Sequence, residues 1–425
     1  MKYILDKSDY ITHKSQLTEY FLKNCKNRSD FKVGIEVERL GVDSKTFHAA
    51  PYSGKNGIAE FLKQFKKLGD FEEVQENGNI LGLKDTCCCD ISLEPGCQFE
   101  CSTKPLLKLK EHEKNFIQFS EKCRTIGEEL GITWIGYGIQ PLSTFDTMEM
   151  IPKQRYNIMR NYLPTKGSRS PVMMLETAGL QTSIDYESEE DAMKKLKVSL
   201  GISPIMTAMF VNSPIRGGKL TGYKSYRANA WLDTDNDRCG LISRKIFEGD
   251  FGFEDYVDIL LDVPMFFKKT GMPFREYMKT HRVTMDDWLL HMTTFFPDVR
   301  LKNFLEIRNC DCQKADMTLA FSALIKGIMY NDDALGHAWD LVKDQSWHER
   351  NELRNSVPKQ GLSQVAGIAR DLVSIAEESL SEEAVYLEKL KELVLGNKTP
   401  ADIIIMNWDL AWGKDLKKLI HYSSL

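Results

Sequence analysis

Five glutamates and Arg308 lie in three short strings whose spacing suits metal and phosphate chemistry: GIEVERLG (34–41), SLEPGCQFE (92–100) and FLEIR (304–308). Successive side chains of a β-strand point to opposite faces, so Glu36 and Glu38 share a face, as do Glu306 and Arg308. Carboxylates gathered on one face repel one another unless hard cations lie between them. Mg²⁺ prefers an all-oxygen shell shared between carboxylates and phosphate. The pattern therefore predicts a nucleotide-phosphate enzyme that uses Mg²⁺.

The residues around the first string indicate a strand with one buried face. Val33, Ile35 and Val37 are apolar and have the parity opposite to Glu36 and Glu38. One face of this strand is therefore expected to pack on a core, and the acidic face is expected to be a polar surface with a purpose.

The second string is not one uninterrupted strand. Pro95 and Gly96 separate Glu94 from Glu100, and this pair of residues is typical of a turn. We therefore expect Glu94 and Glu100 on either side of a tight bend, where strand parity gives no information about their directions.

Arginines occur in two further strings, KQRYNIMRNY (153–162) and KSYRANAWLDTDNDRCG (224–240). Arg155, Arg227 and Arg238 lie in them, and a planar guanidinium binds carboxylate or phosphate through two parallel hydrogen bonds. Neither a Ser-His-Asp arrangement nor a GxxxxGK[ST] loop accompanies them, which argues against a hydrolase or a P-loop kinase.

The elements that must position these strings indicate an α+β fold. Alternating apolar and polar residues predict strands, and helical periodicity predicts helices. The predicted strands cover 31–41, a meander over 71–103, 132–139, 171–186, 225–233 and 299–308. The predicted helices cover 9–26, 57–68, 104–130 and 189–202. Alternation is typical of antiparallel strands, whereas buried parallel strands are continuously apolar.

The chain from residue 315 onward is almost wholly helical by the same criterion. The predicted helices cover 317–330, 333–344, 363–393 and 400–407. We therefore predict one catalytic domain over 1–425, with a sheet-containing core in 1–314 and a mainly helical C-terminal part in 315–425.

Composition argues against several classes of partner. The 425 residues are 42% apolar, enough for a sizeable core, and carry a formal charge of −5, whereas nucleic-acid binding needs a basic field. The segment MKYILDKSDYITHKSQL is too polar for a signal peptide, and the sequence has no apolar run of about 18 residues to span a bilayer. We expect a cytoplasmic monomer or homodimer that binds small molecules, and neither nucleic acid nor membrane.

Ten cysteines in a long chain without an export signal predict reduced thiols. Cys87, Cys88 and Cys89 are adjacent, and Cys97 and Cys101 follow. Two interpretations stay open for this cluster: thiols distributed over strands, or a zinc or iron–sulfur site. Consecutive strand residues cannot converge on one ion, which favours the first interpretation.

Seven strings in a fixed order resemble one known family: SLEPGCQFE, WIGYGIQP, IMRNYLP, SLGISPIMTAMFVNSP, SYRANAWLDTDNDR, GFEDYVDILLDVPMFF and VRLKNFLEIR. Together they resemble the plant-type glutamate-cysteine ligases, which also occur in bacteria, over most of the chain. The resemblance implies a glutamine-synthetase-like sheet, a curved antiparallel funnel flanked by helices, which ATP enters at one end and the amino acids at the other. It further implies ATP-dependent ligation of L-glutamate to L-cysteine through a γ-glutamyl phosphate, the first step of glutathione biosynthesis.

The resemblance also implies roles for residues at matching positions. Arg155 and Arg227 would bind glutamate, while Arg308 and Arg238 would face the transferred phosphoryl group. The Mg²⁺ ligands would be Glu36, Glu38, Glu94, Glu100, Glu306 and Gln181.

The chain departs from the family in two strings. It has MMLET (173–177) where relatives have MMLRT, and GCQFECST (96–103) where relatives have a GGQFELSG-like string. Glu176 thus replaces a cation near the implied amino-acid pocket. Two alternatives therefore stay open beside cysteine ligation: a ligase that joins glutamate to another amine, and a non-catalytic descendant that binds amino acid or nucleotide. Retention of all five glutamates argues against the second, because clustered negative charge is costly without a cation.

Overall fold

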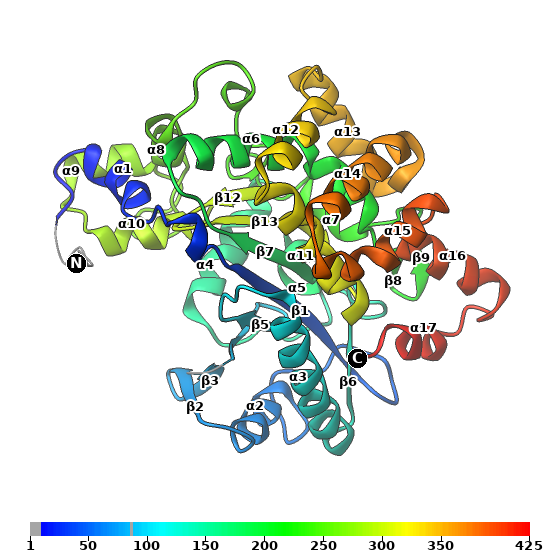
Figure 1. Ribbon diagram of the computed structural model, residues 1–425. Helices are drawn as coiled ribbons and strands as arrows, with labels where there is room; N and C mark the ends of the chain where they lie inside the picture. Colours follow the sequence, from blue (N-terminus) through cyan, green and yellow to red (C-terminus); the bar gives the residue numbers. More distant parts are fainter. Residues whose placement is uncertain (1–9, 86–87) are drawn as a thin grey trace.

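A nine-stranded sheet forms the centre of the computed structural model, which describes residues 10–85 and 88–425 (Figure 1). β6 (Ile132–Ile135) pairs with β1 beside the main path of the sheet. The strand pairs of this sheet are antiparallel. The other eight strands follow the order β12 (Val299–Leu301), β13 (Leu305–Asp311), β7 (Gly179–Ile184), β1 (Val33–Asp43), β5 (Phe99–Thr103), β4 (Cys89–Leu93), β3 (Asn79–Asp85) and β2 (Phe71–Glu76).

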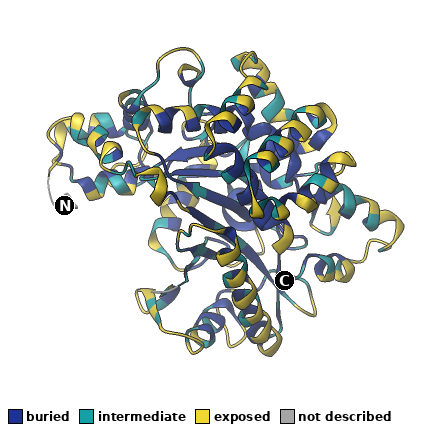
Figure 2. Cartoon of the chain, viewed as in Figure 1, coloured by how far each residue is buried: buried dark blue, intermediate teal, exposed yellow. Residues whose placement is uncertain are grey.

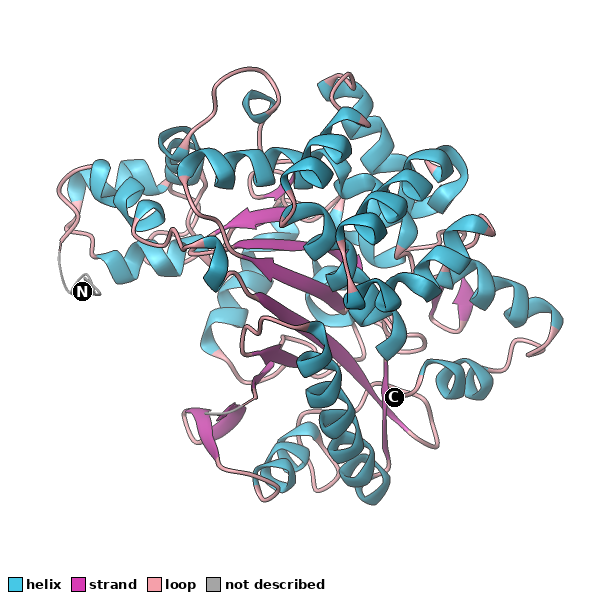
Figure 3. Cartoon of the chain, viewed as in Figure 1, coloured by secondary structure: helices cyan, strands magenta, loops and turns pink. Residues whose placement is uncertain are grey.

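Two long helices cover the apolar face of the sheet. α6 (Glu189–Met209) contacts β12 and β13, and α11 (Ala315–Met329) contacts β1 and β7. Thr182 on β7 points to this side, since its Oγ1 lies 3.0 Å from Ser322 Oγ on α11. Figure 2 shows the strands as the buried centre of the molecule, and Figure 3 shows the helices around them.

The remaining helices form the periphery or carry residues toward the opposite face. Two small two-stranded sheets accompany them, β8 (Ile215–Arg216) with β9 (Lys219–Leu220), and β10 (Cys239–Gly240) with β11 (Phe296–Pro297). The helices are α1 (Ser15–Leu22), α2 (Ile58–Lys66), α3 (Leu109–Leu130), α4 (Gln154–Tyr162), α5 (Ser170–Glu176), α7 (Tyr226–Trp231), α8 (Phe253–Asp262), α9 (Phe274–Thr280), α10 (Met285–Met292), α12 (Asp332–Asp340), α13 (Trp347–Gln360), α14 (Ala366–Ser379), α15 (Glu388–Leu395), α16 (Pro400–Leu410) and α17 (Leu416–Ser423).

Strand β1 has the two faces that its sequence predicts. Val33, Ile35 and Val37 are at most 2% exposed, whereas Glu36 and Glu38 are half-buried on the other face. The predicted α+β class and antiparallel sheet are confirmed, as is the helical character of the chain after β13. None of the helices in the described residues is long and apolar enough to cross a membrane.

Several predicted boundaries are wrong. Residues 225–233 form helix α7 instead of a strand, because the Ser225 hydroxyl accepts a hydrogen bond from Ala228 N and caps a helix start. The predicted strand 171–186 is split into α5 and β7, since Pro171 occupies the first turn of a helix. The predicted helix 363–393 is interrupted after α14 by a 3₁₀ segment, Glu382–Leu387.

Candidate active site

A cavity of about 220 Å³ lies over the polar face of β1. It brings together residues that are up to 272 positions apart in the sequence, from β1, β5, β7, β13, α4 and α7. All of the site residues predicted from the sequence line it except Arg238: Glu36, Glu38, Glu94, Glu100, Gln181, Glu306, Arg155, Arg227 and Arg308.

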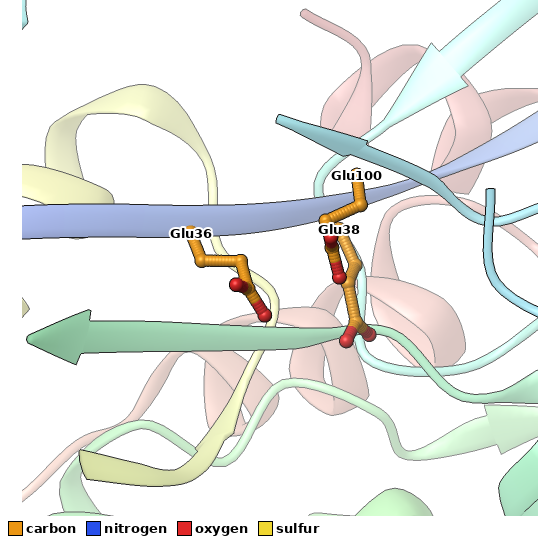
Figure 4. Close-up of side chains that lie close together, drawn as sticks. All are labelled: Glu36, Glu38 and Glu100. Atoms are coloured by element: carbon orange, nitrogen blue, oxygen red, sulfur yellow. The ribbon is translucent and has the colours of Figure 1, made fainter. Parts of the chain in front are cut away.

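Three carboxylates converge in this cavity, and we refer to Glu36, Glu38 and Glu100 as the carboxylate triad. One oxygen atom of each lies within 4.8 Å of the other two. The strand register explains the convergence, because Glu38 lies opposite Glu100 in the β1–β5 pair. Figure 4 shows Glu36 and Glu38 leaving β1 toward the same side, with Glu100 coming from the neighbouring strand.

The triad is hydrogen-bonded, but its charge is not neutralised. Gly179 N donates to Glu38 Oε2 at 2.5 Å, Ser92 Oγ donates to Glu100 Oε1 at 2.5 Å, and Gln181 Nε2 donates to Glu36. Among the residues that the structure describes, no lysine or arginine forms an ion pair with a triad member. These three carboxylates therefore lack a countercharge in direct contact.

The proton affinities of the triad reflect this lack. Burial, with the nearby charge of Glu94, raises the pKa of Glu38 to about 7. Burial and neighbouring carboxylates also raise the pKa of Glu36, and they raise that of Glu100 well above its usual range. Such a site favours whatever positive charge enters it, whether protons or a cation.

Glu306 has a different environment. Its Oε2 lies 2.7 Å from both Arg300 Nη2 and Arg308 Nη1, and its Oε1 lies 3.4 Å from Lys302 Nζ. These cations hold the pKa of Glu306 well below its usual range, although burial acts in the opposite direction. Gln181 connects the two regions, since it accepts a hydrogen bond from Arg308 and donates to Glu36.

Sequence reasoning missed Arg300 and Lys302 as site residues. β12 pairs with β13 so that Arg300 lies opposite Glu306. A turn at residues 302–304 divides the string VRLKNFLEIR, so strand parity gives no information across it. The signal that could have identified both cations is the presence of four charged residues in one ten-residue string. The cavity lining thus combines five carboxylates with five cations.

Glu94 enters the cavity from the predicted bend. Glu94 N donates to Gln98 O at 3.0 Å, and a Cβ on Gly96 would lie 2.0 Å from Leu175 O, so the bend abuts α5 closely. The buried Gln98 side chain accepts from Gly96 N at 2.7 Å and donates to Thr177 O at 2.9 Å. Gln98, which sequence reasoning also missed, therefore ties the Glu94 bend to the cavity wall.

Two arginines lie in the cavity with unused donors. Arg227 on α7 is 4% exposed and donates from Nη2 to Arg308 O at 3.2 Å. The Nε atoms of Arg227 and Arg155 are buried and have no hydrogen-bond partner in the described part of the chain. Gly179 leaves room for Arg227, because a Cβ there would lie 2.5 Å from its Nη2. Unsatisfied guanidinium donors suit an anionic ligand.

Arg238 lies outside the cavity lining, contrary to its predicted position. Its Nε pairs with Asp235 at 2.6 Å, its other nitrogens donate to Thr294 O and Pro264 O, and its guanidinium lies 3.9 Å from the centre of the Phe266 ring. All three guanidinium nitrogens of Arg238 thus donate hydrogen bonds within the fold.

Glu176 is also absent from the cavity lining. Its carboxylate forms a bidentate ion pair with Arg216, at 2.5 and 2.7 Å, and accepts a hydrogen bond from Phe145 N at 2.8 Å. The charge that replaces a family cation is therefore neutralised locally, outside the pocket in which we expected it to act.

The cysteine cluster gives no convergent ligand set in the described chain, where the group that could hold a metal ion is the carboxylate triad. Cys89 and Cys101 are buried thiols on β4 and β5, and Cys97 is a buried thiol in the loop between them. Cys87 lies outside the described residues.

Comparisons with known proteins agree on one family. A family model described as "Glutamate-cysteine ligase family 2 (GCS2)" matches residues 32–396. The chain is 37% identical to the chloroplastic glutamate-cysteine ligase of Nicotiana tabacum and 35% identical to that of Arabidopsis thaliana, each over 95% of this chain and 81% of the relative. A solved glutamate-cysteine ligase from Francisella tularensis, in complex with AMP, has a similar fold, with a TM-score of 0.58 and 14% identity over 93% of this chain and 87% of that one.

The names of these relatives contradict one sequence-based prediction. The two plant relatives are named as chloroplastic enzymes, whereas we expected a cytoplasmic protein. That expectation rested on the lack of a secretory signal pattern, which does not distinguish the cytoplasm from an organelle reached by another route.

Proposed function

The chain belongs to glutamate-cysteine ligase family 2, and we propose that it joins L-glutamate to L-cysteine with conversion of ATP to ADP and phosphate, giving γ-glutamylcysteine. The observation that carries this proposal is a single cavity in which an unpaired carboxylate triad faces a cluster of arginines. This is the first step of glutathione biosynthesis.

Amide formation from a carboxylate and an amine is uphill in water, so the carboxylate must first be activated. Transfer of the γ-phosphoryl group of ATP to the glutamate side-chain carboxylate gives an acyl phosphate. The cysteine amine then attacks its carbonyl carbon, and phosphate leaves. In phosphoryl transfer the protein chiefly positions the reactants and stabilises charge, which is work suited to carboxylates and arginines.

The donor set of the triad fits Mg²⁺. Three mutually close carboxylates without ion-pair partners among the described residues, with raised pKa values, offer hard oxygen ligands that no cation of the protein contacts directly. We propose Glu36, Glu38 and Glu100 as ligands, with Glu94, Glu306 and Gln181 completing the set predicted from the sequence. When bound there, Mg²⁺ would neutralise the charge of the ATP phosphates.

The arginines divide the remaining work. Arg155 and Arg227, with their unused buried donors, bind the glutamate substrate. Arg308 faces the transferred phosphoryl group, assisted by Arg300 and Lys302 around Glu306. Arg238 has no part in this proposal, because its donors are used in the fold.

Release of ADP tests the proposal. The purified chain is incubated with ATP, Mg²⁺ and L-glutamate, together with cysteine or with a panel of other primary amines. We expect ADP release that depends on glutamate and is selective for cysteine, with γ-glutamylcysteine as the product. Selectivity for another amine would overturn the acceptor, and no ADP release with any amine would indicate a non-catalytic descendant. The ion pair of Glu176 with Arg216 removes the observation that favoured another acceptor.

A further inference from the structure

A buried carboxylate lies behind the proposed glutamate site, outside the cavity lining. Asp311, on β13, is 1% exposed. Its Oδ2 accepts hydrogen bonds from Asn212 N and Ser213 Oγ, and its Oδ1 accepts one from Ser225 Oγ, each at 2.7 Å. Two hydroxyls and one amide thus hold a charged group in the interior.

Both hydroxyls connect Asp311 to helix α7. Ser225 caps this helix, since its Oγ accepts from Ala228 N at 2.9 Å. Ser213 Oγ accepts from the backbone N of Arg227 at 3.2 Å. Each serine hydroxyl therefore donates one hydrogen bond to Asp311 and accepts one from a backbone amide in the first turn of α7. These hydrogen bonds fix the direction of that turn relative to the sheet.

Close packing and the charge of Arg227 also link Asp311 to the proposed glutamate site. Gly138 lies so close to Asp311 that a Cβ there would be 2.8 Å from its Oδ2. Burial raises the pKa of Asp311, and the charge of Arg227 is the largest influence that lowers it. Asp311 therefore has a fixed position and an electrostatic contact with the residue that its network holds.

We propose that Asp311 is a positioning residue, which acts through Ser213 and Ser225 to set Arg227 for binding the carboxylate of glutamate. This inference rests on the proposed function. Strand β13 thus carries both Arg308, which faces the phosphoryl group, and Asp311, which orients Arg227 for glutamate.

Steady-state kinetics of Asp311→Asn test the inference. Asparagine has nearly the same shape but lacks the charge, and its amide nitrogen cannot accept from a donor. We expect the KM for glutamate to rise about tenfold, an effect worth roughly one buried charged hydrogen bond. The KM values for ATP and cysteine and the kcat should stay within about twofold to threefold of wild type, because Arg227 would lose orientation and the phosphate side would be intact.

Milder variants guard against a folding defect. Ser213→Ala and Ser225→Ala each remove one hydrogen bond to Asp311, and we expect smaller increases in the glutamate KM. Ser225→Thr should keep the wild-type glutamate KM, because threonine can also cap the helix and donate to Asp311. Asp191→Asn is the matched control: Asp191 is buried and paired with Lys195 at 2.8 Å on α6, so it should lower the melting temperature and leave the glutamate KM unchanged.

The outcomes separate this inference from the proposed function. An unchanged glutamate KM in Asp311→Asn, or equal increases in all three KM values, overturns the positioning role while wild-type ligase activity stands. A wild-type protein that releases no ADP with glutamate and any amine overturns the proposed function instead, and the inference with it.

Discussion

Replacement of Glu38 by glutamine should stabilise the metal-free protein while abolishing most of its activity. Glu38 has a pKa of about 7, against 4.5 for an unperturbed glutamate. Between these values the folded protein holds a proton that the unfolded chain has lost. The free energy of unfolding of wild type therefore falls as the pH rises from about 4.5 to about 7. Glutamine does not ionise, so the free energy of unfolding of Glu38→Gln does not fall for this reason.

The size of the effect follows from the shift. Because folding raises the pKa of Glu38 from 4.5 to about 7, ionisation of this carboxyl removes up to about 3 kcal/mol of unfolding free energy from wild type by pH 8. We expect Glu38→Gln to gain about 1–3 kcal/mol at pH 8 and less than about 1 kcal/mol at pH 5. The glutamine oxygen can still accept the hydrogen bond from Gly179 N, so the local geometry should persist.

The assay is urea unfolding at pH 5, 6, 7 and 8 in the presence of a chelator, with turnover measured in parallel in Mg²⁺. Glu72→Gln is the control, since Glu72 is exposed on β2 and distant from the triad. Addition of Mg²⁺ should stabilise wild type more than Glu38→Gln, because an ion that binds only the folded state adds to stability. Turnover of Glu38→Gln should fall by at least about a hundredfold through loss of a ligand charge.

Two results would refute this reasoning. If Glu38→Gln were less stable than wild type at pH 8 in chelator, or if its advantage did not change with pH, the triad would not carry an uncompensated charge. If the variant kept full turnover at low Mg²⁺, Glu38 would not be a metal ligand.

Three further predictions concern the cations and the metal. Arg227→Lys should raise the glutamate KM about tenfold with little change in the ATP KM, because the planar fork is lost; an unchanged glutamate KM in steady-state assays would remove Arg227 from the substrate site. Arg238→Met should leave that KM unaltered but lower the unfolding free energy by about 3–5 kcal/mol, as Asp235 is left buried and unpaired; a normal urea midpoint would contradict its structural role. Binding of Mg²⁺ should release more protons at pH 6.5 than at pH 8.5, since Glu38 is mostly protonated only at the lower value. Titration calorimetry in two buffers of different ionisation enthalpy measures this release, and equal values at both pH values would speak against the carboxylate triad as the metal site.

Strand parity and resemblance predicted most of the charged residues that line the cavity. Glu36 and Glu38 share a face because β1 is regular there, and parity alone suffices for a regular strand. The convergence of Glu100 on Glu38 depends on the β1–β5 register, which no single sequence contains. The family resemblance nevertheless predicts that Glu38 and Glu100 lie close together, because it assigns both of them to the Mg²⁺ ions.

The failures have a common physical origin in distant contacts. The sequence pattern predicts a strand where α7 forms, because six residues are too few for a reliable helical period. The start of α7 depends on Ser225 and on Asp311, 86 residues further along the chain. Two of the polar partners of the Arg238 side chain, Thr294 and Pro264, are likewise remote in sequence. Charge type suggested a binding role for Arg238, and only the position of its partners shows a structural one.

Gly179 contacts both the proposed metal site and the proposed glutamate site. Its amide holds Glu38 at 2.5 Å, and its bare Cα lies under the guanidinium of Arg227. A ligand that draws Arg227 toward itself therefore changes the packing of Arg227 against Gly179. Gly179 is also the residue whose amide holds the Glu38 carboxylate, a proposed ligand of the cation. Thermodynamic linkage makes such an effect mutual, so saturation with amino acid should change the ion's dissociation constant by the same factor by which the ion changes that of the amino acid.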